Sequence, residues 1–317
     1  MTVEIAQQVL AEAGFDPRLV MLAAEQADGQ IAQELASHQD VRLIDYTGGN
    51  EFGDWLEIHA RQAQLYKEQA GVNCVLIDSV DNLDRACQNL AFSLSLYSGQ
   101  MCTTPQAVLI PRDGIGSADG RLSFEQVCRA LAGAVEGLLS DPDRASGILG
   151  AIPNPATLAR LDQAGALGRV VLASQQHAHP QFKGTSYRTP LMLSVEGSSE
   201  VWRQEQFGPI SFLVAVDDTA QGLALIADTV ATQGAITLGV YSTDESVLQQ
   251  AEQMAIEQSV ALSCNLDSGV FVNQSAAFSD FHATGNNPAA NAALTDPAFV
   301  AGRFAVVQSR RHVDPET

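Results

Sequence analysis

The sequence predicts an α/β fold in which a mostly parallel sheet carries helices. Two observations lead to this prediction. Short runs of apolar and β-branched residues alternate along the chain with longer segments of helical periodicity, and turns rich in glycine or proline separate them. In addition, 46% of the 317 residues are hydrophobic, mainly Ala, Leu and Val, which is enough to bury a core in two lobes.

The amino-terminal part of the chain alternates helix and strand. Helices are expected at 3–13 and 31–39, and strands at 20–24 and 41–46. A glycine-rich turn then leads from the second strand into a helix within 47–62. This strand-turn-helix order is typical of a parallel sheet.

A second series of elements follows. The expected strands are 72–78, 105–111, 213–218, 235–243 and 260–265. A helix is expected over 81–99, with Asp81 as its N-cap and Gly99 as its stop. Between the second and third of these strands, helices mix with loops rich in glycine and proline.

Charge and cysteine usage exclude several classes of protein. The net charge is −20, so neither nucleic acid nor an anionic membrane is an expected partner. No apolar run approaches the ~18 residues that span a bilayer, and the amino-terminal sequence does not resemble a signal peptide. The five cysteines form no CxxC pair and no cluster with histidines. We therefore expect a reduced, cytoplasmic protein without a metal site.

Cys102, in the segment GQMCTT, is the candidate nucleophile. It follows the expected stop of a long helix and precedes a strand, so it lies in a tight turn whose N–H groups could stabilise an oxyanion. A loop cysteine taken alone is more often structural. The remaining cysteines (Cys74, Cys87, Cys128 and Cys264) all fall on apolar faces of expected strands or helices, where cysteine behaves as a small hydrophobe.

Three further segments carry weaker signals. Glu68 stands between an apolar stretch and a glycine-containing turn, where a partly desolvated carboxylate is suited to act as a general base, although a surface glutamate is the simpler interpretation. The segment EQFGPI (205–210) could hold a ribose and a flat ring, or could be an ordinary loop before a strand. The segment YTGGNEFG (46–53) could cradle a pyrophosphate, although it lacks GxGxxG spacing.

Together, the order and spacing of these segments resemble the aldehyde dehydrogenase superfamily. Its "TGS", "ELGG", "GQxC" and "ExFGP" motifs correspond here to 46–49 (YTGG), 68–71 (EQAG), 99–102 (GQMC) and 205–209 (EQFGP). Cys102 lies 34 residues after Glu68, as in the superfamily. The resemblance implies NAD(P)-dependent oxidation of an aldehyde to a carboxylic acid, with Cys102 as nucleophile and Glu68 as the base that activates water.

The same resemblance implies a set of cofactor contacts and a domain organisation. The residues expected to contact NAD or NADP are Thr47, Gly48, Gly49, Gln69, Glu205 and Phe207. The implied fold is a parallel-sheet catalytic domain (70–285) with a partial Rossmann-like cofactor domain (1–69) and a carboxyl-terminal tail (286–317). Superfamily members are longer, so we expect a truncated form that lacks an oxyanion-hole Asn and an adenine-ribose Lys.

Three residues depart from the superfamily pattern, and the end of the chain resembles one of its branches. Gly49 replaces a serine hydroxyl, and Gln69-Ala70-Gly71 stands where the superfamily has Leu-Gly-Gly after the glutamate. Residues 279–312 resemble the phenylacetic acid degradation proteins of the PaaN type, which implies a ring-opened, CoA-linked semialdehyde as substrate. Phe281 and His282 are expected to line the substrate tunnel, and an extended segment at 303–311 is expected to form a homo-oligomer.

Two other functions fit the same residues. The chain could be an inactive scaffold or oligomerisation module whose motifs are inherited but unused. It could also be a cofactor-free esterase or thioesterase that uses Cys102 and Glu68.

Overall fold

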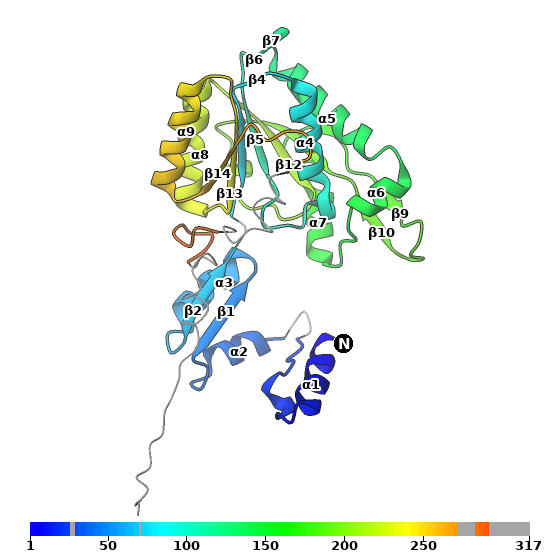
Figure 1. The fold of residues 1–317 in the computed structure, drawn as a ribbon, viewed down its shortest axis with the longest axis vertical. Helices are drawn as coiled ribbons and strands as arrows, with labels where there is room; N and C mark the ends of the chain where they lie inside the picture. Colours follow the sequence, from blue (N-terminus) through cyan, green and yellow to red (C-terminus); the bar gives the residue numbers. More distant parts are fainter. Residues whose placement is uncertain (26–28, 70, 272–282, 292–317) are drawn as a thin grey trace, which may run out of the picture. The chain divides into compact units, whose positions relative to one another are not determined.

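A computed structural model describes residues 1–25, 29–69, 71–271 and 283–291 (Figure 1). The chain divides into two compact units. The first comprises Met1–Tyr46 and Glu51–Tyr66, and the second comprises Thr47–Asn50 and Lys67–Thr317. Within the described ranges, every helix is too short or too polar to cross a lipid bilayer.

The first unit is small and only partly packed. Its elements are α1 (Thr2–Glu12), η1 (Pro17–Leu19), α2 (Ile31–Ser37), most of β1 (Leu43–Thr47), most of α3 (Asn50–His59) and most of β2 (Gln64–Glu68). β1 and β2 form a two-stranded sheet. The expected helices and the expected strand at 41–46 are present, within two residues of their predicted bounds.

The strand expected at 20–24 does not form. Met21 and Leu22 are 74% and 72% exposed, and the segment pairs with no strand of the described chain. An apolar run becomes a strand only when a neighbouring strand accepts its backbone hydrogen bonds, so hydrophobicity alone was an insufficient guide here.

The second unit contains a seven-stranded sheet in the part of the chain described. Its order is β14 (Ala261–Cys264), β13 (Thr237–Tyr241), β3 (Cys74–Ile77), β5 (Ala107–Pro111), β12 (Ile210–Val216), β11 (Leu191–Glu196) and β8 (Arg169–Leu172). Every neighbouring pair is parallel except β8 with β11. The prediction of a mostly parallel sheet is confirmed.

Helices cover both faces of this sheet (Figure 1). One face packs against α4 (Leu83–Ser95) and α5 (Phe124–Leu138), and the other against α8 (Thr219–Gln233) and α9 (Glu245–Gln258). Strand β5 is fully buried. Val108 and Ile110 point to the core formed with α4 and α5 (the first core), and Ala107 and Leu109 point to the core formed with α8 and α9 (the second core). This two-sided burial explains the unbroken apolar run of its sequence.

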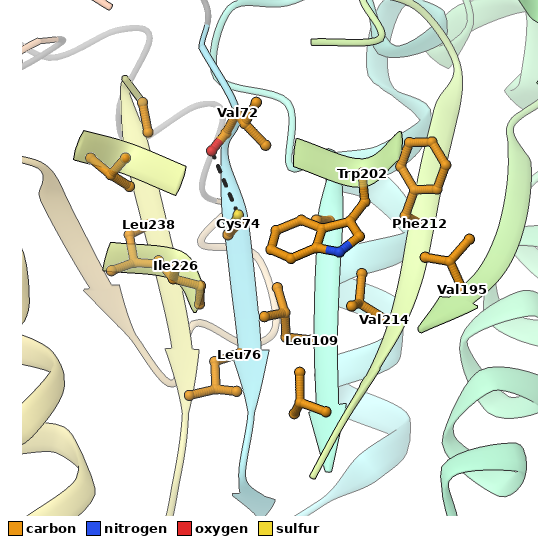
Figure 2. Packing of buried hydrophobic residues seen from close by; sticks show 14 of the residues in the cluster. Val72, Cys74, Leu76, Leu109, Val195, Trp202, Phe212, Val214, Ile226 and Leu238 are labelled. Atoms are coloured by element: carbon orange, nitrogen blue, oxygen red, sulfur yellow. Dashed lines mark hydrogen bonds between the residues drawn. The ribbon is translucent and has the colours of Figure 1, made fainter. Parts of the chain in front are cut away.

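The second core contains the largest fully buried side chain among the described residues, Trp202 (Figure 2). It lies among Cys74, Leu109 and Phe212, which belong to three neighbouring strands. Trp202 belongs to η3 (Val201–Arg203), so the turn that precedes the segment EQFGP is anchored in the core of the sheet. The indole Nε1 donates to the carbonyl of Gly197 at 3.2 Å, which satisfies its buried donor.

The helix before the Cys102 turn differs in detail from its prediction. Its N-cap is Asn82, whose side chain accepts a hydrogen bond from the Arg85 N–H, and not Asp81. α4 ends at Ser95, and η2 (Leu96–Gly99) carries the chain to Gly99 through positive φ angles at Tyr97 and Ser98. The sequence lacked a glycine or proline at residues 95–98 that would have marked this earlier end.

Shorter elements complete the second unit. They are β4 (Ser79–Val80), β6 (Ile115–Ser117), β7 (Gly120–Leu122), α6 (Pro142–Ile148), α7 (Pro155–Ala164), β9 (Gln176–Ala178) and β10 (Ser186–Arg188). Of these, α7 matters most for the site described next.

Candidate active site

The candidate residues gather at the amino ends of the parallel strands. The segments 71–73, 100–106 and 205–209 lead into β3, β5 and β12, which are successive neighbours in the sheet. Because the strands are parallel, the three segments lie at the same end of the sheet. A pocket of about 430 Å³ opens there within the second unit. It is lined by Thr47, Gly48, Gly49, Glu68, Gln69, Gln100, Cys102, Asn154, Thr157, Arg160, Glu205 and Phe207.

The structure therefore brings together every sequence-predicted site residue that it describes. Both proposed catalytic side chains, Cys102 and Glu68, line this one pocket together with the proposed cofactor contacts. Phe281 and His282, expected in the substrate tunnel, and residues 303–311, expected in an oligomer contact, lie outside the described residues.

Cys102 lies in a turn and is partly exposed. It packs against a small apolar cluster formed by Ile236, Ala283, Ala289 and Ala290. The turn is closed by a hydrogen bond from Thr104 N to the carbonyl of Met101 at 3.1 Å. A thiol in such a turn is accessible from the pocket while its backbone is held in place, which suits a nucleophile.

The other cysteines lie in different surroundings. Cys74, Cys87 and Cys128 are buried, and burial raises the pKa of each thiol to about 12. Cys264 is exposed, which corrects its expected place on an apolar face. It ends β14, the strand at the edge of the sheet, whose other residues are only partly buried. The pKa of Cys264 is raised by partial burial and by the carboxylates of Glu252 and Glu245.

Glu68 is the last residue of β2 and is half-buried. Its carbonyl accepts a hydrogen bond from Gly48 N at 3.1 Å, and it forms an isolated antiparallel bridge with Ala290. The next residue, Gln69, donates its N–H to the carbonyl of Ala289 at 2.6 Å. Glu68 is thus held between the glycine turn and the segment that packs against Cys102.

The glycine turn at 47–49 is exposed on the pocket wall. A Cβ added to Gly49 would meet no atom within 4 Å, so a ligand can approach the backbone here. The turn leads directly into α3. The side chain of Gln69 is buried and donates to the carbonyl of Asn50 at 3.1 Å, so its amide holds the turn.

Glu205 and Phe207, from the segment EQFGP, line the same pocket. Burial raises the pKa of the Glu205 carboxyl, and the nearby Arg160 guanidinium partly opposes this shift. Arg160 also donates to the carbonyl of Phe207 at 2.8 Å. Phe207 is 37% exposed. An exposed ring beside a carboxylate offers a flat apolar face and a hydroxyl acceptor on the same wall.

Sequence reasoning missed the contribution of α7. Thr157 and Arg160 come from this helix, Asn154 is its N-cap, and all three line the pocket. The available signal was Asn154-Pro155, an N-cap followed by a proline at the first helical position, with Arg160 on the same helix. The buried amides of Asn73 and Gln106 were also missed, although each is a polar residue at the start of an apolar strand.

The chain resembles known proteins in sequence and in fold. Residues 1–285 match the sequence model of the aldehyde dehydrogenase family. The crystal structure of an NAD-dependent aldehyde dehydrogenase from Burkholderia multivorans is 56% identical and superposes with a TM-score of 0.91, covering 99% of this chain and 57% of that one. The structure of 1-pyrroline-5-carboxylate dehydrogenase from Thermus with bound NAD, at 20% identity, has a TM-score of 0.62 over 84% of this chain and 51% of that one.

Curated relatives are more distant. The N-succinylglutamate 5-semialdehyde dehydrogenase of Burkholderia mallei is 24% identical over 247 residues, which are 76% of this chain and 48% of the relative. The peroxisomal aminoaldehyde dehydrogenase 1 of Pisum sativum is 24% identical over 230 residues, which are 70% of this chain and 44% of the relative. The chain spans about half the length of the curated relatives that it matches.

Proposed function

Because this chain belongs to the aldehyde dehydrogenase family, we propose that it performs the thiol chemistry of NAD(P)-dependent oxidation of an aldehyde to a carboxylic acid. The observation that supports this most directly is that Cys102, Glu68 and Glu205 line one pocket of about 430 Å³. One pocket then offers a thiol for attack on the aldehyde and a carboxylate for hydrolysis. It also offers a carboxylate that can accept hydrogen bonds from the ribose hydroxyls of the cofactor.

The reaction that we propose begins with attack of the Cys102 thiolate on the aldehyde carbon, which forms a C–S bond and an oxyanion. We propose that backbone N–H groups of the turn around Cys102 stabilise that oxyanion. The nicotinamide ring, when bound, would supply the hydride acceptor. Loss of hydride from the adduct would leave a thioester on Cys102. Glu68 then takes a proton from water, whose oxygen attacks the thioester carbon and releases the acid and the thiol.

The residues that would hold the cofactor fit its chemistry. The glycine turn at 47–49 leaves its backbone accessible for a pyrophosphate, since nothing fills the space beside Gly49. The Glu205 carboxylate can accept hydrogen bonds from ribose hydroxyls, and Phe207 can cover the nicotinamide. In this proposal residues 1–69 belong to the cofactor domain, 70–285 to the catalytic domain and 286–317 to the tail.

The finer proposal concerns the substrate. We propose a ring-opened, CoA-linked semialdehyde of phenylacetate catabolism, on the resemblance of residues 279–312 to the PaaN type. We also propose that the protein is cytoplasmic and forms a homo-oligomer. A kcat/KM for the CoA-linked semialdehyde that is no higher than for propanal would contradict the substrate assignment.

The test uses the purified full chain with NAD, with NADP, and with neither, and propanal as the probe aldehyde. NADH or NADPH formation by the natural chain but not by Cys102→Ala supports the proposal. Hydrolysis of 4-nitrophenyl acetate without any nicotinamide, again dependent on Cys102, would identify an esterase instead. If neither reaction is detected, the chain is a structural module and the proposed function is wrong.

A further inference from the structure

We propose that two buried amides, Asn73 and Gln106, are positioning residues. They hold the Cys102 turn (residues 100–104) and the Glu205 loop (residues 204–208) in one rigid arrangement. This rests on the proposed function in so far as Cys102 is the nucleophile. Neither side chain lines the pocket of about 430 Å³, so both would act through the loops that they bind. Asn73 is 3% exposed and Gln106 is 7% exposed.

Asn73 binds the Cys102 turn directly. Its Nδ2 donates to the carbonyl of Cys102 at 2.6 Å and to the carbonyl of Thr104 at 3.2 Å. Its Oδ1 accepts hydrogen bonds from the backbone N–H groups of Ile236 and Thr237, each at 3.0 Å. Because backbone carbonyls only accept and backbone N–H groups only donate, the partners fix the orientation of this amide.

The hydrogen bonds accepted by Asn73 Oδ1 connect the Cys102 turn to the start of β13. Ile236 is also one of the apolar residues against which Cys102 packs. Asn73 therefore fixes both the backbone that carries the thiol and the wall beside it. A buried amide with all four of these hydrogen bonds made holds its neighbours in a single geometry, since breaking any of them leaves a buried polar group unsatisfied.

Gln106 performs the corresponding task for the Glu205 loop. Its Nε2 donates to the carbonyl of Trp202 at 3.0 Å and to the carbonyl of Gln204 at 2.8 Å, and its Oε1 accepts the N–H of Gln206 at 2.6 Å. The residue between the last two partners is Glu205. Its backbone is thus held on both sides by one side chain.

The two amides are joined to each other. The backbone N–H of Gln106 donates to the carbonyl of Asn73 at 2.8 Å. Asn73, Cys102 and Glu205 are consequently linked through a short series of buried hydrogen bonds, in which Gln106 is the intermediate. A change in the position of either loop would have to break bonds in the interior of the protein.

The test compares isosteric variants that each replace an amide donor by a carboxylate oxygen. Asn73→Asp removes both donors to the Cys102 turn and keeps the acceptor for Ile236 and Thr237. Gln106→Glu does the same for the Glu205 loop. The matched control is Asn89→Asp, because Asn89 is 1% exposed and donates to the carbonyl of Val270, which belongs to neither loop.

The first readout is the rate at which limiting iodoacetamide alkylates Cys102, measured against pH by peptide mass spectrometry with Cys264 as the internal reference. For Asn73→Asp we expect at least a tenfold fall, equivalent to about 1.4 kcal/mol, and a profile displaced to higher pH by the added carboxylate. Asn73→Ser is neutral and retains one hydroxyl donor, so its alkylation rate should lie between those of the natural chain and Asn73→Asp. Asn89→Asp should leave the profile unchanged.

The second readout is amide hydrogen exchange, with thermal unfolding measured alongside. Exchange should accelerate at 100–104 in Asn73→Asp and at 204–208 in Gln106→Glu, and at neither in Asn89→Asp. The proposal is overturned if the Cys102 profile of Asn73→Asp and Asn73→Ser stays within twofold of the natural chain, if Cys102 reacts faster, or if exchange in all three carboxylate variants follows their loss of stability alone. None of these measurements uses an aldehyde or a nicotinamide. They therefore test the positioning role of Asn73 and Gln106 even if the chain does not oxidise an aldehyde.

Discussion

Gly99 and Gly208 bring two distant motifs into backbone contact, since a Cβ added to Gly99 would lie 2.5 Å from the carbonyl oxygen of Gly208. Gly99 begins the segment GQMC and has a φ of +65°, a conformation that other residues rarely adopt. Gly208 belongs to the segment EQFGP and has a φ of +130°. Gly99 is therefore needed where the Cys102 turn meets the Glu205 loop, whereas a Cβ added to Gly208 would lie 2.8 Å from the side chain of Thr157.

Gly99→Ala should separate these two loops. The added methyl group meets a backbone carbonyl and imposes an unfavourable φ, so we expect a loss of roughly 1–3 kcal/mol in the free energy of unfolding. Urea unfolding followed by circular dichroism measures it. The matched control is Gly133→Ala, because Gly133 lies in α5 with no atom within 4 Å of an added Cβ. That change should raise stability by up to about 1 kcal/mol, and an equal loss in both variants would argue against the contact.

Cys102 should be alkylated before every other cysteine of the native chain. Burial raises the pKa of Cys74, Cys87 and Cys128 to about 12, so at pH 8 only on the order of one molecule in ten thousand carries each thiolate. Cys264 is exposed, but its pKa is also raised. Competitive labelling read by peptide mass spectrometry checks the order. In urea all the cysteines should react alike, and preferential labelling of Cys264 in the native chain would contradict the assignment of Cys102.

Glu68→Gln should uncouple oxidation from hydrolysis if the proposed function holds. The variant keeps the shape of the side chain but cannot accept a proton from water. We expect one equivalent of NADH in a burst, followed by slow turnover, with an acyl group retained on Cys102. Rapid-mixing absorbance and intact-protein mass spectrometry measure the two quantities. Steady turnover equal to that of the natural chain would assign the water-activating role to another group.

Glu205→Gln should stabilise the protein at neutral pH. Burial raises the pKa of Glu205 above its ordinary value of 4.5, so the folded chain holds this proton more tightly than the unfolded chain. The contribution to stability is complete below the ordinary value and is lost as the pH rises through the raised one. The Tm of Glu205→Gln should therefore exceed that of the natural chain at pH 7, and the difference should vanish in acid.

Glu196→Gln provides a control of opposite sign. The Arg112 guanidinium, hydrogen bonded to Glu196, lowers the pKa of that carboxyl. Its contribution to stability is present above the ordinary value and is lost as the pH falls. This variant should melt at a lower temperature than the natural chain at pH 7. The assignment would fail if both variants shifted the Tm in the same direction.

Much of this architecture follows from local sequence pattern. The strands β3, β5, β12 and β13 are apolar runs bounded by turns, and their burial on both faces agrees with parallel pairing. The run at 20–24 has the same character but forms no strand, because strand formation depends on a partner that local pattern does not reveal.

The polar residues of the site were predictable only where a motif marked them. Cys102 and Glu205 stand in recognisable motifs. Asn73, Gln106 and Arg160 do not, and their importance comes from partners 29 to 164 residues away. A single polar residue beside an apolar strand gives no indication of which distant carbonyls it will bind.

The position of the site at the amino ends of the strands has a consequence for folding. Each functional segment is fixed only when the strand after it has paired with its neighbours, and Asn73 reaches partners at Ile236 and Thr237 that lie 163 and 164 residues further along the chain. A contact of such long range forms only once the long loop between its partners has been closed, at a cost in entropy. The reactive thiol should therefore be acquired and lost together with the whole sheet, with no partly unfolded state that retains it.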